Sequence, residues 1–115
     1  MTMPKPHRTL HLTPVEVWEA QRTGATYTPE AFAADGFIHC TDRDERLMTV
    51  ANLFYQADPR PFLVLTVDLG AVTAQWLYED EAEEFPHIYG PLETAAVVAV
   101  RSVRRDEVGR FLGIG

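Results

Sequence analysis

Residues 9–13 read Thr-Leu-His-Leu-Thr, and residues 36–41 read Gly-Phe-Ile-His-Cys-Thr. Because successive side chains of a β-strand point to opposite faces, the alternation in both stretches predicts short, half-buried strands. His11 falls on the polar face of the first strand, and His39 shares a face of the second with Phe37 and Thr41. If the two strands lie in one sheet, we expect both imidazoles to line the same cleft.

Helix-start signals follow these strands. Thr13, Pro14 and Glu16 form a capping-box pattern that predicts a helix from residue 14 to about residue 24. A second pattern at residues 28–30 predicts a helical turn that Gly36 closes. Thr41 or Asp42 is expected to cap a third helix, whose apolar stripe at helical spacing would pack on the sheet: Leu47, Val50, Ala51 and Phe54.

The second half of the chain is richer in strand patterns. We predict strands over residues 62–69, 73–78 and 95–103, a rigid loop over residues 85–92 and a short helix over residues 106–111. With helices mainly in the first half, this order predicts a single α+β domain over residues 1–115 with a mixed or antiparallel sheet.

The composition and net charge of the chain argue against several classes of function. The net charge of −7 disfavours binding to bulk nucleic acid, and the longest apolar run, residues 95–100, is too short to span a membrane. The first residues are basic without a following apolar stretch, so we expect no secretory signal and a cytoplasmic location. The single cysteine, Cys40, excludes an internal disulfide and is expected in the core, on the strand face opposite His39.

Three segments together resemble a family catalogued as domain of unknown function 952: Leu10-His-Leu-Thr13, Gly36-Phe-Ile-His-Cys-Thr41 and Phe85-Pro-His-Ile-Tyr-Gly-Pro-Leu92. The resemblance covers residues 8–103 and leaves residues 1–7 as an N-terminal arm. It implies a fold similar to ADP-ribosyltransferases, in which a split sheet cradles NAD.

By position within that superfamily, His11 looks like the residue that contacts the adenosine ribose, and His39 like the residue beside the nicotinamide. The superfamily glutamate has no clean match, because Glu79, Glu83 and Glu84 fall in an expected loop; His87 and Tyr89 follow instead.

The resemblance therefore implies an NAD- or ADP-ribose-binding protein, with ADP-ribosyl transfer or glycohydrolase chemistry as its activity. The candidate catalytic residues are His39, His87 and His11, and the candidate ligand-binding residues are His11, Thr13, His39, Thr41 and Tyr89. A neutral imidazole offers one donor and one acceptor and titrates near neutrality, which suits both roles.

Other interpretations stay open. Each histidine could instead satisfy a backbone group, and both threonines could cap helices. The alternative function is a non-catalytic module that binds a ligand or a protein. A third is a metal-dependent hydrolase that uses three histidines, although their spacing matches no compact metal motif.

Overall fold

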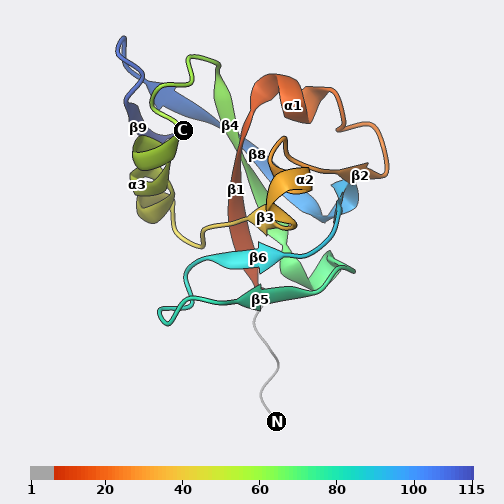
Figure 1. Ribbon diagram of the computed structural model, residues 1–115. Coiled ribbons are helices and arrows are strands. Elements are labelled where there is room, and N and C mark those ends of the chain that lie inside the picture. Colours follow the sequence, from red (N-terminus) through yellow and green to blue (C-terminus); the bar gives the residue numbers. More distant parts are fainter. Residues whose placement is uncertain (1–6) are drawn as a thin grey trace.

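The computed structural model describes residues 7–115, so the predicted arm over residues 1–7 lies, apart from His7, outside the described residues. Its largest element is a four-stranded antiparallel sheet in the order β1-β4-β8-β9 (Figure 1). The strands are β1 (Arg8–Pro14), β4 (Phe62–Asp68), β8 (Val97–Arg105) and β9 (Phe111–Ile114). The strong period-two and β-branched patterns of β1, β4 and β8 place these strands close to where the sequence predicts them.

A smaller sheet lies beside β1. It contains β3 (Ile38–His39), β6 (Pro86–Ile88) and β5 (Trp76–Tyr78), while β2 (Thr26–Tyr27) and β7 (Leu92–Glu93) form a separate antiparallel pair. A single bridge between Leu10 and Thr41 connects β1 to the segment after β3. The predicted α+β class with antiparallel pairing is confirmed, although β1 and β3 belong to different sheets.

The helices are short and lie in the first half of the chain, as predicted: α1 (Val15–Glu19), α2 (Phe32–Asp35) and α3 (Asp44–Phe54). Two 3-10 turns, η1 (Leu69–Ala71) and η2 (Thr94–Ala96), follow strands β4 and β7. Within residues 7–115 no helix is long and apolar enough to cross a membrane.

The main core lies between the two sheets and includes fully buried Tyr27, Ile38, Leu65 and Ile88. Cys40 is buried in the same cluster, which confirms its predicted place in the core.

Both predicted capping arrangements are wrong. Strand β1 continues through Pro14, because Thr13 pairs with Leu63 in the sheet. Helix α1 therefore begins only at Val15, has no side-chain cap and ends at Glu19. Helix α3 begins at Asp44, again without a side-chain cap. Arg43 occupies the N-cap position, so neither Thr41 nor Asp42 caps the helix. The backbone of Thr41 pairs with Leu10, and the Asp42 carboxylate accepts a hydrogen bond from the Tyr78 hydroxyl.

Three further predictions are corrected by the structure. His87 lies on strand β6 rather than in a rigid loop. The segment expected to be a helix over residues 106–111 is instead a turn that leads into β9. The Asp106 carboxylate accepts hydrogen bonds from the backbone N–H groups of Val108 and Arg110, and Gly109 has a φ of 89°, which is not helical. Phe54, expected to pack on the sheet, is 73% exposed at the end of α3.

Candidate functional site

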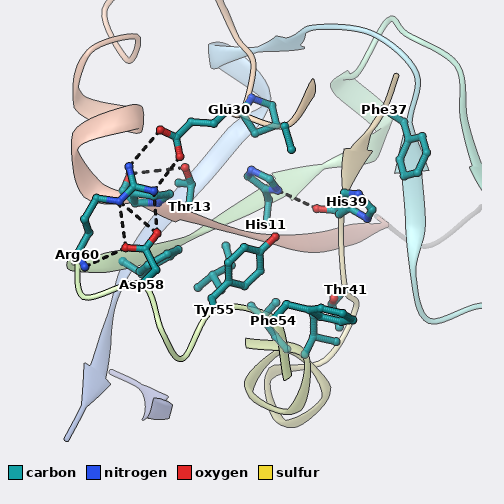
Figure 2. Close-up of a pocket in the computed structure, with 17 residues that line it drawn as sticks. His11, Thr13, Glu30, Phe37, His39, Thr41, Phe54, Tyr55, Asp58 and Arg60 are labelled. Carbon is teal, nitrogen blue, oxygen red and sulfur yellow. Dashed lines mark hydrogen bonds and ion pairs between the residues drawn. The ribbon is translucent and has the colours of Figure 1, made fainter. Parts of the chain in front are cut away.

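A pocket of about 310 Å³ opens beside β1, between the segment before α2 and the C-terminal half of α3. Figure 2 shows its layout: His11 lies in the middle, Arg60 with its acidic partners lies at one end, and His39 and Thr41 lie toward the other. The volume is at the lower end of the range of roughly 300–1,000 Å³ that is usual for small-molecule sites. Much of the wall is apolar or aromatic, including Leu12, Val50, Phe54, Tyr55 and Phe62.

His11 is a buried part of the pocket wall with both ring nitrogens engaged. Its Nδ1 lies 2.7 Å from the backbone carbonyl oxygen of His39, and its Nε2 lies 2.9 Å from the Tyr27 hydroxyl. Burial lowers the pKa of His11 to about 4, so the ring is neutral at pH 7. A neutral ring beside a carbonyl must donate from Nδ1, and Nε2 therefore accepts the phenolic proton.

The hydrogen-bond chain continues to the Thr13 hydroxyl, 2.8 Å from that of Tyr27. Since the single Tyr27 proton goes to His11, the Thr13 hydroxyl donates to the phenol oxygen. Both His11 and Thr13 line the pocket as predicted, but their polar atoms are already paired within the protein. His11 therefore has the contacts expected of a buried histidine that satisfies a backbone carbonyl, here that of His39.

His39 lines the pocket with a side chain that is 54% exposed. Its Nε2 lies 2.8 Å from Asp35 Oδ2, at a separation of four residues. The chain brings the two together because α2 ends at Gly36, whose φ of 80° is a left-handed conformation that glycine adopts without strain. A carboxylate that holds one ring nitrogen orients the imidazole and leaves the other nitrogen for a ligand.

Like the 37% exposed Tyr55, Thr41 lines the pocket with a hydroxyl that has no partner among the side-chain contacts of the described residues. It is only 3% exposed and lines the pocket, yet its hydroxyl makes none of the side-chain hydrogen bonds found among residues 7–115. Its backbone is held by the bridge to Leu10. Among residues 7–115 the fully buried side-chain oxygens without a partner are Thr9 Oγ1 and Asp42 Oδ1, so the Thr41 oxygen itself stays accessible and can be reached by a ligand.

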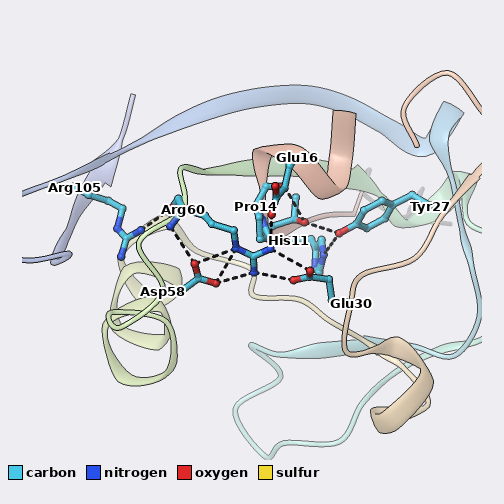
Figure 3. A network of polar contacts seen from close by, with 9 residues as sticks. His11, Pro14, Glu16, Tyr27, Glu30, Asp58, Arg60 and Arg105 are labelled. Atoms are coloured by element: carbon cyan, nitrogen blue, oxygen red, sulfur yellow. Dashed lines mark hydrogen bonds and ion pairs between the residues drawn. The ribbon is translucent and has the colours of Figure 1, made fainter. Parts of the chain in front are cut away.

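The other end of the pocket holds an ion-pair network around Arg60 (Figure 3). Its guanidinium lies 2.7 Å from Asp58, 2.9 Å from Glu30 and 2.7 Å from Glu16. These contacts lower the pKa values of Asp58 and Glu30 through hydrogen bonds from Arg60, and they raise the pKa of Arg60. Arg105 donates a hydrogen bond of 2.7 Å to the Arg60 carbonyl oxygen, and its charge also lowers the pKa of Asp58, so the network holds three carboxylates and two guanidinium groups.

His87 and Tyr89 lie outside the pocket. His87 pairs with His39 across β3 and β6, but its ring stacks on Phe37 at 4.0 Å and its Nδ1 lies 3.1 Å from Glu79 Oε1. Tyr89 packs 5.5 Å from Phe37. The structure therefore brings together His11, Thr13, His39 and Thr41 of the predicted residues in the pocket wall. His87 and Tyr89 pack against Phe37 instead, and the His87 ring also lies 5.5 Å from the His39 ring.

The alternative function as a metal-dependent hydrolase would need three or more side chains that can bind one metal ion. Within residues 7–115 no group of three or more His, Cys, Asp or Glu side chains is arranged to do so. The nitrogens of His11 are occupied by His39 and Tyr27, and His87 pairs with Glu79.

Sequence reasoning missed much of the pocket wall. Glu30, Phe54, Tyr55, Asp58 and Arg60 line the pocket but come from segments that share no local motif with the histidines. The turn at residues 58–61, in which Asp58 and Arg60 alternate with two prolines, was the available signal for a rigid charged corner.

Comparison with known proteins identifies the family model described as "Protein of unknown function (DUF952)", which matches residues 12–100. No curated protein matches the chain. The crystal structure of protein CC0527 from Caulobacter crescentus is similar, with a TM-score of 0.73, 20% identity and coverage of 91% of this chain and 93% of that one. The solution structure of CC0527 has a TM-score of 0.66 and 22% identity, and it covers 90% of each chain. These similarities show a shared fold.

Proposed function

The chain belongs to the family of proteins of unknown function DUF952, and we propose that it binds a small organic ligand in the pocket beside β1, with His39 and Thr41 as its polar contacts. The observation that carries the proposal is Thr41, a residue of the pocket wall that is 3% exposed and whose hydroxyl has no hydrogen-bond partner among the described residues. Aromatic side chains around it provide the apolar surface that such sites use for affinity, while a few polar groups fix orientation.

NAD and ADP-ribose remain the ligands suggested by the resemblance to the ADP-ribosyltransferase fold. The pocket volume suits one ring system with an attached sugar better than a whole dinucleotide. Arg60 is the only Lys or Arg among the described pocket-lining residues, and three carboxylates already neutralise it. We therefore propose that a nicotinamide- or riboside-sized moiety occupies the pocket and that any phosphate lies outside it.

Catalysis is a second candidate function, favoured by the contact between His39 and Asp35. An imidazole held by a carboxylate can accept a proton from a ligand hydroxyl or from water, and ribosyl transfer or glycoside hydrolysis needs such a group. Positioning would provide much of the remaining rate enhancement. The pocket-lining acids are Glu30 and Asp58, both tied to Arg60, so no described carboxylate of the pocket is free to replace the superfamily glutamate.

Thermal unfolding with and without nicotinamide, nicotinamide riboside, NAD and ADP-ribose tests the proposal. A ligand present at 100 times its Kd stabilises a protein by about 2.7 kcal/mol, which is readily measured as a rise in Tm. We expect the rise to disappear in His39→Gln and to persist in His7→Gln, a matched change at a partly exposed histidine that does not line the pocket. A rise that survives in His39→Gln, or that is lost equally in both variants, would contradict the assignment of the site.

Turnover of the same ligands tests the catalytic candidate separately. We expect Asp35→Asn to reduce any hydrolysis or transfer more than it reduces binding, because that carboxylate orients His39 without lining the pocket. Equal losses in binding and turnover would indicate that the pair serves binding alone.

A further inference from the structure

The charge balance of the pocket points to the chemical class of its ligand, and this inference rests on the proposed function. We propose that the pocket selects an organic cation, an aromatic or aliphatic amine whose apolar body lies among the aromatic side chains and whose ammonium group faces Glu30 and Asp58.

Negative charge exceeds positive charge at the Arg60 end of the pocket. Asp58 lies within 2.7 Å and Glu30 within 2.9 Å of the guanidinium, and Glu16 adds a third carboxylate at 2.7 Å. The Arg60 guanidinium is thus shared by three carboxylates, and Arg105, whose charge helps to lower the pKa of Asp58, is the second cation of the network, so three anions stand against two cations. An incoming anion would find the guanidinium fully occupied, whereas an incoming ammonium group would find carboxylates with excess charge.

The exposure of these groups leaves room for such a contact. The side chains of Asp58 and Arg60 are 25% and 31% exposed, so the network is partly shielded from water, and Glu30 is 57% exposed at the rim. Partial shielding strengthens a charge contact relative to an open surface.

The walls suit a cation with an apolar body. Phe54, Tyr55 and Phe62 line the pocket, and Figure 2 shows Tyr55 between Asp58 and Thr41. The negative face of an aromatic ring attracts an ammonium group, which makes aromatic side chains with adjacent carboxylates a common setting for bound amines.

The second observation that points to a ligand is Thr41, which is independent of the acidic network. This residue is 97% removed from solvent, lines the pocket and has no hydrogen bond from its hydroxyl to another described residue. Figure 2 places it at the end of the pocket away from Arg60. A ligand that reaches both ends would have its polar tail on Thr41 and its ammonium group on the carboxylates.

Three probes of matched size and different charge test the inference: benzylamine, benzyl alcohol and benzoate. Titration of each into the ¹⁵N-labelled full chain, followed by amide shifts of the pocket residues, gives three dissociation constants under one condition. We expect benzylamine to bind about tenfold more tightly than benzyl alcohol, benzoate to bind most weakly, and added salt to narrow the difference.

Removing the charge of one carboxylate tests whether the ion-pair network around Arg60 causes the preference for benzylamine. Glu30→Gln should reduce the preference for benzylamine over benzyl alcohol several-fold, while Glu81→Gln, an equal charge change on an exposed residue away from the pocket, should leave that preference unchanged. The amide spectra of both variants show directly whether the fold is retained.

The outcomes separate the two proposals. Binding of benzyl alcohol or benzoate as tight as that of benzylamine would overturn the selection of a cation and leave the pocket as a ligand site. If no probe shifts the pocket amides, the proposed function fails, and the selection of a cation fails with it.

Discussion

At the scale of single residues, His11 shows how a histidine on the polar face of a strand becomes part of the core. The sequence places it in the middle of β1 with both neighbours apolar. In the structure it is 4% exposed, and it connects β1 to Tyr27 and to the backbone of His39. It holds the wall of the pocket in place, while the half-exposed His39 side chain is free to contact a ligand.

The first prediction concerns the protonation of His11. Its pKa of about 4 lies below the ordinary value of 6.5, so the unfolded chain binds a proton between these values that the native protein does not. Stability is therefore complete above pH 6.5 and falls as the pH drops toward 4, by about 3 kcal/mol for this group.

Ring-carbon chemical shifts of the histidines, followed from pH 8 downward, measure that protonation directly. We expect His11 to remain in the neutral form with hydrogen on Nδ1 until the pH approaches 4. A midpoint near 6.5 would show that the ring is accessible to water and would remove it from the core.

The second prediction compares two buried threonines of the pocket. Thr41→Val removes a hydroxyl that lacks a protein partner, so we expect the free energy of unfolding to change by less than about 0.5 kcal/mol or to rise. Thr13→Val removes a hydroxyl bonded to Tyr27, and it should cost about 1 kcal/mol. Urea unfolding measures both changes.

We expect the effects on ligand affinity to be the reverse of the effects on stability: Thr41→Val should lose more affinity than Thr13→Val. Were Thr41→Val to destabilise the protein as much as Thr13→Val, the Thr41 hydroxyl would have a structural partner and the proposed contact would be wrong.

At the scale of elements, the connection between α2 and β3 sets the geometry of the His39 and Asp35 pair. Gly36 turns the chain with a φ of 80°, so the last residue of the helix faces the second residue of the strand. A Cβ added at Gly36 would meet no atom within 4 Å, so the requirement for glycine is one of backbone conformation alone.

Gly36→Ala should therefore destabilise the protein by about 1–2 kcal/mol, the cost of a left-handed conformation for a residue with a Cβ. Gly24→Ala is the matched control, because Gly24 has no positive φ and an added Cβ would have its nearest contact at 3.4 Å. We expect the control to change stability by less than about 0.5 kcal/mol. Equal effects in thermal unfolding would show that the turn tolerates other conformations.

Long elements with strong periodicity were predictable, and short ones were not. The strands over residues 62–68 and 97–105 follow from runs of β-branched and aliphatic residues. Strands β6 and β9 are three and four residues long. Their state depends on pairing with β3, β5 and β8, which no local pattern encodes. The predicted cap at Thr13 failed for the same reason, since pairing with β4 outweighed a local helix signal.

At the scale of the whole molecule, the pocket assembles from segments that lie far apart in sequence. Residues 11–14 provide one wall, residues 29–31 and 37–41 the rim, and residues 47–62 the opposite side. His11 and His39, which the alternating patterns singled out, both line the pocket, although their strands belong to different sheets. The partners of Arg60 could not be predicted, because Glu16, Glu30 and Asp58 meet it only after α1, α2 and the turn before β4 have packed together (Figure 3).

The most direct test of the central claim is a crystallographic soak of the protein with a library of small fragments, read out as bound density. We predict that fragments collect in the pocket beside β1, with a hydrogen bond to the Thr41 hydroxyl or to His39. Density confined to other surfaces, with the pocket empty across the library, would contradict it.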